Sequence, residues 1–191
     1  FNHSGTVSIS NCNPSIGNVA DSTRTATLDG GTWTNSGGLE IGRSGTGTLN
    51  FNGGTISSVD AFLGSEATGN GTVTMTGGIW TNSGQFRVGN NGTGTLNMSG
   101  GAITNTIGVV GNGTGSTGTA TVSGGTWTNS GSLTVGNNGT GTFTISGGAV
   151  SNTIGVVGGG ATGSGTATVS SGTWTNSGNL IVGNQGTGTF N

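Results

Sequence analysis

Charged residues are scarce in this chain of 191 residues, and lysine and tyrosine are absent. Only 4% of the residues are Asp, Glu, Lys or Arg, the formal net charge is −2, and nothing beyond Arg87 is charged. Such a surface cannot neutralise a phosphate backbone, which excludes nucleic-acid binding by counterion release. It also lacks the basic amphipathic face that adsorbs on anionic membranes. No segment approaches the roughly 20 apolar residues of a membrane-spanning helix, so we expect no membrane insertion.

Cysteine and histidine occur once each, as Cys12 and His3. A single cysteine excludes an internal disulfide, and we interpret Cys12 as a small buried hydrophobe in an irregular first coil. One histidine gives poor support to transition-metal ligation or to a Ser–His pair. The glycine-rich segments carry Asn-Asn-Gly or Asn-Gly-Thr instead of the aspartate of calcium-binding nonapeptide repeats. We therefore expect no metal and no cofactor.

The acidic residues are few and scattered, without an Asp-x-x-Asp or Asp-Asp cluster: Asp21, Asp29, Glu40, Asp60 and Glu66. General acid–base catalysis needs two carboxyl groups that converge in a cleft with separated pKa values. We therefore expect no enzyme, and a polysaccharide-active β-helix enzyme is the most distant alternative. Two strings, at 113–118 and 158–163, match the dinucleotide motif G-x-G-x-x-G, but a strand-like Thr-Ala-Thr-Val follows where that motif needs a helix.

Glycine is abundant, with 46 residues, and threonines recur in pairs spaced by one residue. The steps between successive pairs alternate between twenty-one and twenty-six residues, so every second pair is displaced by 47. A fainter pair, Ser4/Thr6, precedes the others. A strict period of this length indicates one supersecondary unit laid down repeatedly, as in a solenoid. The pairs are Thr25/Thr27, Thr46/Thr48, Thr72/Thr74, Thr93/Thr95, Thr119/Thr121, Thr140/Thr142, Thr166/Thr168 and Thr187/Thr189.

Each unit contains three short segments of alternating polarity separated by glycine-rich corners. Alternation at period two, β-branched residues and glycine punctuation predict strands and turns, and no segment shows helical spacing. We expect an all-β chain wound as a right-handed parallel β-helix. It would have about nine coils of twenty-one or twenty-six residues, with the extra five residues in a corner. We divide one continuous domain into irregular N-terminal coils at 1–24 and four 47-residue double coils at 25–191, the last incomplete.

The alternation also predicts which residues form the core. Ala26 and Leu28, with their counterparts in later units, would face inward, as would one aliphatic or tryptophan residue of each second segment. The apolar residues of each third segment, from Leu39 and Ile41 to Leu180 and Val182, are expected inside as well. Tryptophans that faced outward would instead form a sugar-stacking stripe, but Ile56, Ile103 and Val150 share their column. A column of asparagines lies two residues after the inward residue of the second segment, and we expect these amides to hydrogen-bond to one another along the rod. The column consists of Asn35, Asn82, Asn105, Asn129, Asn152 and Asn176.

The segment at 125–143 reads Gly-Thr-Trp-Thr-Asn-Ser-Gly-x-Leu-x-Val-Gly-x-x-Gly-Thr-Gly-Thr-Phe and is followed by Ile-Ser-Gly-Gly-Ala-Val-Ser-Asn at 145–152. This pattern resembles the repeat shared by bacterial autotransporter passenger regions and exosortase-sorted (PEP-CTERM) exported proteins. The resemblance covers nearly the whole chain from Thr25 onward. It implies an extracellular or cell-surface location and a β-helical, adhesin-like stalk, without indicating a ligand.

The outward threonine pairs are the candidate binding surface. We predict a structural stalk that makes multivalent weak contacts with glycans, a host or neighbouring-cell surface, or other copies of itself. The alternative is ice binding, because stacked pairs would repeat hydroxyls and methyls about 4.8 Å along the rod and ~6.7 Å across it. Such arrays resemble the ice-binding faces of antifreeze β-solenoids. Against both hypotheses stands the high strand propensity of threonine, which explains the pairs without any ligand.

Overall fold

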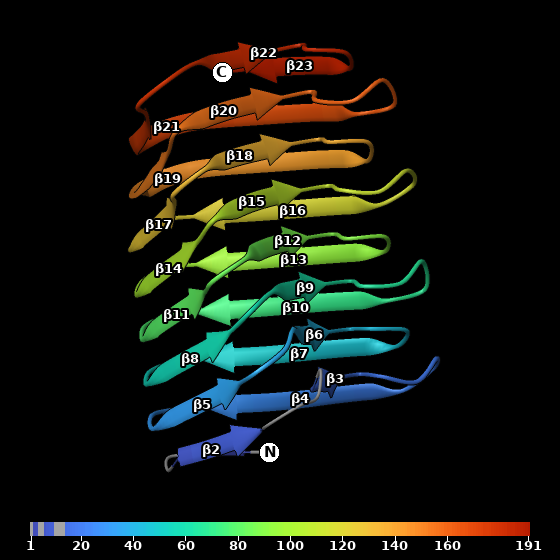
Figure 1. Ribbon diagram of the computed structural model, residues 1–191, viewed down its shortest axis with the longest axis vertical. Helices are drawn as coiled ribbons and strands as arrows, with labels where there is room; N and C mark the ends of the chain where they lie inside the picture. Colours follow the sequence, from blue (N-terminus) through green and yellow to red (C-terminus); the bar gives the residue numbers. More distant parts are fainter. Residues whose placement is uncertain (1, 4–5, 10–13) are drawn as a thin grey trace.

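The computed structural model describes residues 2–3, 6–9 and 14–191. The described residues form strands and no helix, and the strands wind into a β-solenoid (Figure 1). Seven complete turns of three strands run from β4–β6 to β21–β22, with short strands before them and β23 after them. The parallel β-helix is therefore confirmed, and the expected count of nine coils is slightly too high. Cys12 and Ser4 lie outside the described residues.

Strands in equivalent positions of successive turns form three columns. The first column consists of β1 (Asn2–His3), β4 (Thr23–Leu28), β7 (Thr46–Phe51), β10 (Asn70–Met75), β13 (Thr93–Met98), β16 (Thr117–Val122), the first halves of β19 (Thr140–Asn152) and β21 (Ser164–Asn176), and β23 (Thr187–Phe190). The second consists of β2 (Thr6–Ile9), β5 (Thr32–Asn35), β8 (Thr55–Ser58), β11 (Ile79–Asn82), β14 (Ala102–Asn105), β17 (Thr126–Asn129) and the second halves of β19 and β21. The third consists of β3 (Ser15–Ile16), β6 (Leu39–Ile41), β9 (Ala61–Leu63), β12 (Gln85–Val88), β15 (Ile107–Val110), β18 (Ser132–Val135), β20 (Ile154–Val157) and β22 (Leu180–Val182).

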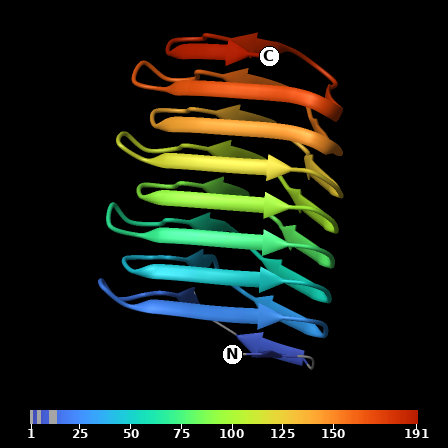
Figure 2. The ribbon, with the colours of Figure 1, turned by 180° about the vertical axis from the view of Figure 1, so that it is seen from behind.

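All pairing between described strands is parallel and joins each strand to its counterpart one turn away, as between β10 and β13. In Figure 2 the first-column strands lie nearest the viewer and run from left to right, and the chain returns behind them while it rises. This is a right-handed winding. The backbone hydrogen bonds run along the rod, so every turn supports its two neighbours and stability accumulates along the solenoid.

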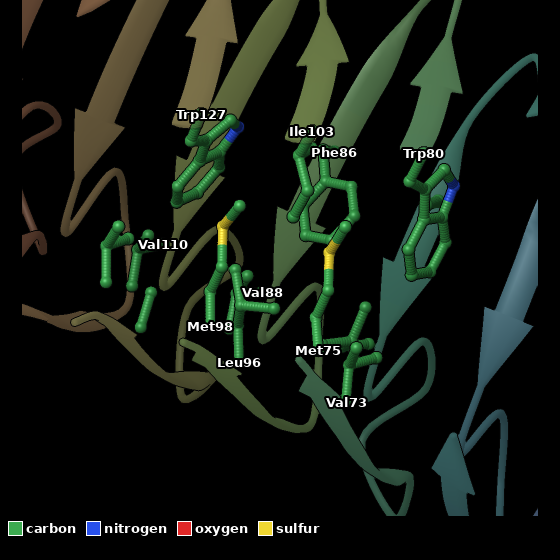
Figure 3. Close-up of a cluster of buried hydrophobic side chains, with 14 of the residues drawn as sticks. Val73, Met75, Trp80, Phe86, Val88, Leu96, Met98, Ile103, Val110 and Trp127 are labelled. Atoms are coloured by element: carbon green, nitrogen blue, oxygen red, sulfur yellow. The ribbon is translucent and has the colours of Figure 1, made fainter. Parts of the chain in front are cut away.

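The core is a continuous apolar column enclosed by the three strand columns (Figure 3). The predicted inward positions are buried along the middle of the rod, and Trp80 and Trp127 are fully enclosed. Tryptophan and phenylalanine rings meet edge to face, with the centroids of Trp80 and Phe86 5.1 Å apart. The tryptophans therefore face inward, and the sugar-stacking stripe is excluded. Leu180 and Val182 were also expected inside, but they are exposed because β22 is the outermost strand of its sheet.

The length of each turn differs from the expected alternation of twenty-one and twenty-six residues. Thr95 pairs with Thr72 on one side and with Thr119 on the other, so the turns alternate between twenty-three and twenty-four residues. The corners between the third and first strands alternate between four residues, as at 42–45, and six, as at 64–69. The longer corners project at one edge in Figures 1 and 2. In the turns with the six-residue corner, the corner between the second and third strands is one residue shorter than in the other turns. The two kinds of turn therefore differ in length by only one residue.

A column of glycines explains the repeated Thr-Gly-Thr. Gly118 occupies an inward position of β16 and pairs with Gly94 and Gly141 in the neighbouring turns. A Cβ at Gly118 would lie 2.1 Å from the carbonyl oxygen of Val88 and 2.3 Å from the amide nitrogen of Gly111. No side chain fits in this space, so from β7 onward the start of each first strand packs directly on neighbouring backbone, whereas the exposed Arg24 holds this position in β4.

The asparagine column is confirmed, but it forms pairs and not one continuous ladder. Asn105 Nδ2 donates to Asn129 Oδ1 over 2.6 Å, and Asn152 donates in the same way to Asn176. Ser58 takes the asparagine position in its turn and donates to Asn82 Oδ1. Asn82, Asn105 and Asn152 also accept from indole nitrogens, which couples the polar column to the aromatic core.

Candidate functional site

The outer surface of the first strand column, here called the threonine face, carries the threonines that the sequence singled out. They form three files along the rod. The central file contains a threonine in every turn: Thr25, Thr48, Thr72, Thr95, Thr119, Thr142, Thr166 and Thr189. The leading file is Thr23, Thr46, Asn70, Thr93, Thr117, Thr140, Ser164 and Thr187, and the trailing file is Thr27, Asn50, Thr74, Asn97, Thr121, Thr144 and Thr168.

The sequence predicted that each threonine pair would stack directly on the next, but the pairs do not stack in this way. Thr25/Thr27 occupies the central and trailing files, whereas Thr46/Thr48 occupies the leading and central files. Successive pairs are thus staggered by two residues, because the pair spacings of twenty-one and twenty-six residues each differ by two from the turn lengths of twenty-three and twenty-four. The structure brings all sixteen predicted threonines onto one face, but only the central file is made of threonine throughout. The stagger produces a wider array than two stacked columns would.

The threonine face is uniform in chemistry. From Thr23 onward, nineteen of its twenty-three file positions are threonine, three are asparagine and one is serine. None of the threonines is buried, and no charged or aromatic side chain occupies a file position. In Figure 2 the supporting strands lie side by side as nearly straight arrows. The face therefore offers hydroxyl and methyl groups at regular intervals of about 4.8 Å along the rod.

The hydroxyl groups of this face are largely free of protein partners. Among its nineteen threonines, only Thr25 and Thr168 take part in a side-chain interaction within the described part of the chain. Corner threonines behave differently: Thr68 Oγ1 donates to the carbonyl of Ser44, and Thr106 Oγ1 to that of Ser83. Water or an external ligand must therefore satisfy the hydroxyls of the threonine face.

The other two outer surfaces differ from the threonine face. On the second column Thr104 Oγ1 donates to Thr81 Oγ1 over 3.3 Å, and Ile79, which is 52% exposed, interrupts the neighbouring file. The third column carries the outward file Glu40, Phe62, Arg87, Val109, Thr134, Val156 and Ile181, with a single threonine. Strand propensity alone would enrich threonine on all three surfaces. The second column from β5 onward is enriched as well, with threonine at nine of its fourteen outward positions, whereas only the first column carries a file of threonine throughout.

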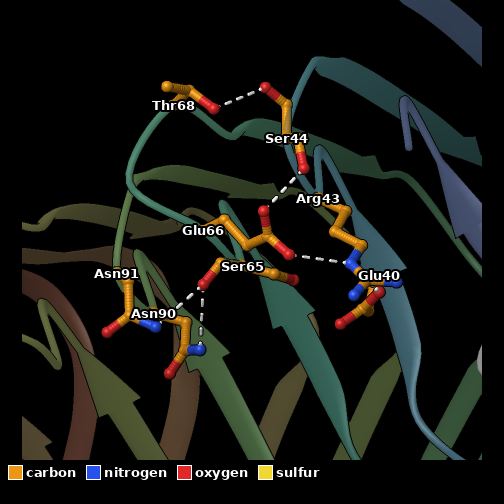
Figure 4. A network of polar contacts seen from close by, with 8 residues as sticks. All are labelled: Glu40, Arg43, Ser44, Ser65, Glu66, Thr68, Asn90 and Asn91. Atoms are coloured by element: carbon orange, nitrogen blue, oxygen red, sulfur yellow. Dashed lines mark hydrogen bonds and ion pairs between the residues drawn. The ribbon is translucent and has the colours of Figure 1, made fainter. Parts of the chain in front are cut away.

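The acidic residues lie mainly at corners and in one small cluster (Figure 4). Arg43 Nε lies 3.0 Å from Glu66 Oε1 and 3.5 Å from Glu40 Oε2, and Ser44 Oγ donates to Glu66 over 2.7 Å. Burial raises the pKa of Glu40, whereas the hydrogen bonds from Ser44 and Arg43 lower the pKa of Glu66. The two carboxyl groups have separated pKa values, but Arg43 lies between them and ties them together as an ion-pair cluster.

The remaining acids include two with local partners. Asp29 accepts from Asn52 Nδ2, and Asp60 accepts from the backbone N–H of Gln85. Within the described residues no group of three or more His, Cys, Asp or Glu side chains could hold a metal ion. No described helix is long and apolar enough to cross a membrane.

Two hollows lie away from the acidic cluster. One, of about 730 Å³, opens beside β3 and β4 and is lined by Pro14, Val19, Arg24 and Trp33. A shallower one, of about 430 Å³, lies at the corner formed by Thr134, Asn137, Val156 and Asn184. Sequence reasoning did not anticipate this second hollow. It forms where Gly159 replaces the asparagine that Asn112 and Asn137 supply in other turns, and where Asn137 Nδ2 donates to Asn112 Oδ1.

Comparison of the chain with models of known protein families, with curated proteins and with solved structures found no match to any of them. The resemblance to bacterial surface repeats stays a prediction from the sequence.

Proposed function

We propose that this chain is the stalk of an exported bacterial surface protein and that it makes many weak contacts through its threonine face. The observation that carries this proposal is the concentration of unpaired hydroxyl groups on one face of a rod built entirely from stacked turns. The proposal assigns the chain a mechanical and adhesive role without catalysis. Its location outside the cell rests on the sequence resemblance.

The rod is suited to bear contacts over its length. Each turn is held by parallel backbone pairing on both sides and by a core in which Trp80, Phe86 and Trp127 contact one another in series. The edge-to-face rings add about 0.5–1.5 kcal/mol per pair beyond their buried area. Neighbouring turns therefore stay in a fixed spacing, so contacts made by one turn position those of the next.

Individual contacts of the threonine face are weak, because a neutral hydroxyl gains only about 0.5–1.5 kcal/mol from a hydrogen bond in exchange with water. Several in-register threonines that engage one extended partner act together, since each contact raises the effective concentration for the next. Attachment should therefore depend steeply on the number of turns engaged.

A bead assay tests this proposal. Beads coated with the chain at graded densities are applied under flow to surfaces that carry bacterial polysaccharide or the chain itself. We expect retention that rises more than proportionally with density and that falls several-fold for Thr95→Lys/Thr119→Lys. The matched control is Thr104→Lys/Thr126→Lys, which alters outward threonines of the same two turns on the second column. Equal loss in both variants, or no retention on either surface, would rule out adhesion to polysaccharide or to a second copy through the threonine face.

A further inference from the structure

We infer that the threonine face binds ice. This inference rests on the proposed function, because it concerns the same contact surface. It goes beyond that function by naming the partner, which is crystalline water. Three properties of the face lead to it, namely its periodicity, its neutrality and the state of its hydroxyls.

Periodicity restricts the ligand. The central file presents one threonine per turn, and the leading and trailing files lie two residues to either side of it. The repeat is about 4.8 Å along the rod and ~6.7 Å across it. Many weak contacts add only if the ligand can engage them simultaneously. A ligand that gains from all three files must therefore itself be regular in two dimensions.

The threonine side chains are also held in place. A β-branched side chain has restricted χ1, so its hydroxyl and methyl groups keep their orientation. Cross-strand contact between Thr95, Thr119 and Thr142 limits this freedom further, because each lies directly opposite the next. The array presents an ordered pattern before the ligand arrives, and binding loses little side-chain entropy.

Neutrality and shape argue against charged ligands and against small sugars. No file position carries a charge, so the files form no ion pair with a charged ligand. Small sugars bind in concave sites with a few directed polar groups and an apolar wall. The hollows of this chain lie elsewhere, apart from Thr25 at the edge of the larger one. An extended lattice of water needs neither charge nor a cleft.

The unpaired hydroxyls favour water over a second rod. Seventeen of the nineteen threonines on this face make no side-chain interaction with the described protein. Two such faces pressed together would displace the water that satisfies these hydroxyls and leave many of them without partners, which is unfavourable. A water lattice lets each hydroxyl both donate and accept while the methyl groups occupy the spaces between water molecules.

Ice-affinity partitioning and thermal hysteresis test this inference on the whole chain at millimolar concentration. We expect the wild type to enter a slowly grown ice hemisphere in preference to a globular protein of equal size, and to depress the freezing point below the melting point. Thr95→Lys/Thr119→Lys should lower both effects several-fold, whereas Thr104→Lys/Thr126→Lys should leave them unchanged. Far-UV circular dichroism and thermal melting of each variant establish that the solenoid is intact.

Two more conservative substitutions of Thr119 separate the contribution of the hydroxyl group from that of the methyl group. Thr119→Ser keeps the hydroxyl but loses the methyl, and Thr119→Val keeps the shape but loses the hydroxyl, so each should show a partial loss. A wild type without partitioning or hysteresis overturns the inference, as does equal loss in the two lysine variants. Association of wild-type rods in sedimentation, abolished only by the threonine-face variant, would also overturn it in favour of a second copy. If ice activity is absent while coated beads still attach through the face, the stalk proposal stands and only its assignment to ice fails.

Discussion

Trp127 donates a hydrogen bond of 2.8 Å from Nε1 to Oδ1 of Asn105 in the preceding turn. Asn105 in turn donates from Nδ2 to Asn129 Oδ1, two residues beyond Trp127. Asn105 thus fixes both an indole and an amide of the next turn. Trp174 and Asn152 repeat the relationship two turns later. A buried polar group therefore sets the stacking of alternate turns, and the aromatic core cannot slide relative to the strands.

The first prediction concerns this contact. Asn105→Ala leaves the Trp127 N–H and the Asn129 Oδ1 without a partner in the core, and each unsatisfied buried group costs about 1–3 kcal/mol. We expect a drop of about 2–5 kcal/mol in the free energy of unfolding, measured by urea titration with circular dichroism. Asn97→Ala is the control, because Asn97 belongs to the same turn but is exposed on the threonine face. A change below about 0.5 kcal/mol for Asn105→Ala would show that the contact does not stabilise the rod.

The second prediction concerns the glycine column. Gly118→Ala places a methyl group against the backbone of Val88 and Gly111, so the corner must move. Forced overpacking costs typically about 1–3 kcal/mol, and more where only backbone surrounds the site. Gly30→Ala is the comparison, since nothing lies within 4 Å of the position that its Cβ would take and its φ is ordinary. It should be neutral or slightly stabilising. Melting temperatures of the two variants measure the difference, and equal values would contradict the packing described for the first strands.

The third prediction concerns pH. Burial raises the pKa of Glu40 above its usual 4.5, so the folded chain holds this proton to higher pH than the unfolded chain does. Its contribution to stability is therefore largest at low pH and falls as the pH rises through the folded-state pKa. Glu40→Gln removes this dependence. The variant should gain stability relative to the wild type as the pH rises from about 4 to about 7.

Glu66→Gln provides the opposite case. Hydrogen bonds from Ser44 and Arg43 lower the pKa of Glu66, so its contribution is present above the usual pKa and is lost as the pH falls through the folded-state value. This variant should lose stability relative to the wild type near neutral pH and match it in acid. Urea midpoints at a series of pH values test both variants. Parallel curves for the two would contradict the environments described here.

The sequence predicted much of the fold because a period of two and a period of 47 are both visible in it. Alternation identified the inward residues, such as Val122, Trp127 and Val135, and the asparagine column beside them. It failed at Leu180 and Val182, because burial there requires a further turn against β22, and alternation within one strand says nothing about neighbours. The predicted turn lengths of twenty-one and twenty-six residues were wrong for a different reason.

The error in turn length came from treating all Thr-x-Thr pairs as equivalent. The residue between the threonines could have distinguished them. It is glycine in Thr46-Gly47-Thr48 and valine in Thr72-Val73-Thr74. Glycine marks the position that packs on backbone, and an apolar residue marks the next inward position. Aligning glycine with glycine gives turns that alternate between twenty-three and twenty-four residues, as the strand pairing shows. No sequence pattern could have predicted that the hydroxyls of the threonine face lack protein partners, because hydrogen bonding depends on the positions of the side chains in the fold.

A diffraction structure at high resolution tests the central claim most directly, since it locates water over the threonine face. We predict that Thr119 lies directly between Thr95 and Thr142, and that the hydroxyls of Thr48, Thr72, Thr95, Thr119, Thr142 and Thr166 contact ordered water and no protein acceptor. If Thr119 instead lay opposite Thr93 or Thr140, or if these hydroxyls were bonded to one another or to backbone carbonyls, the face would not be the regular and unpaired array on which the proposals depend.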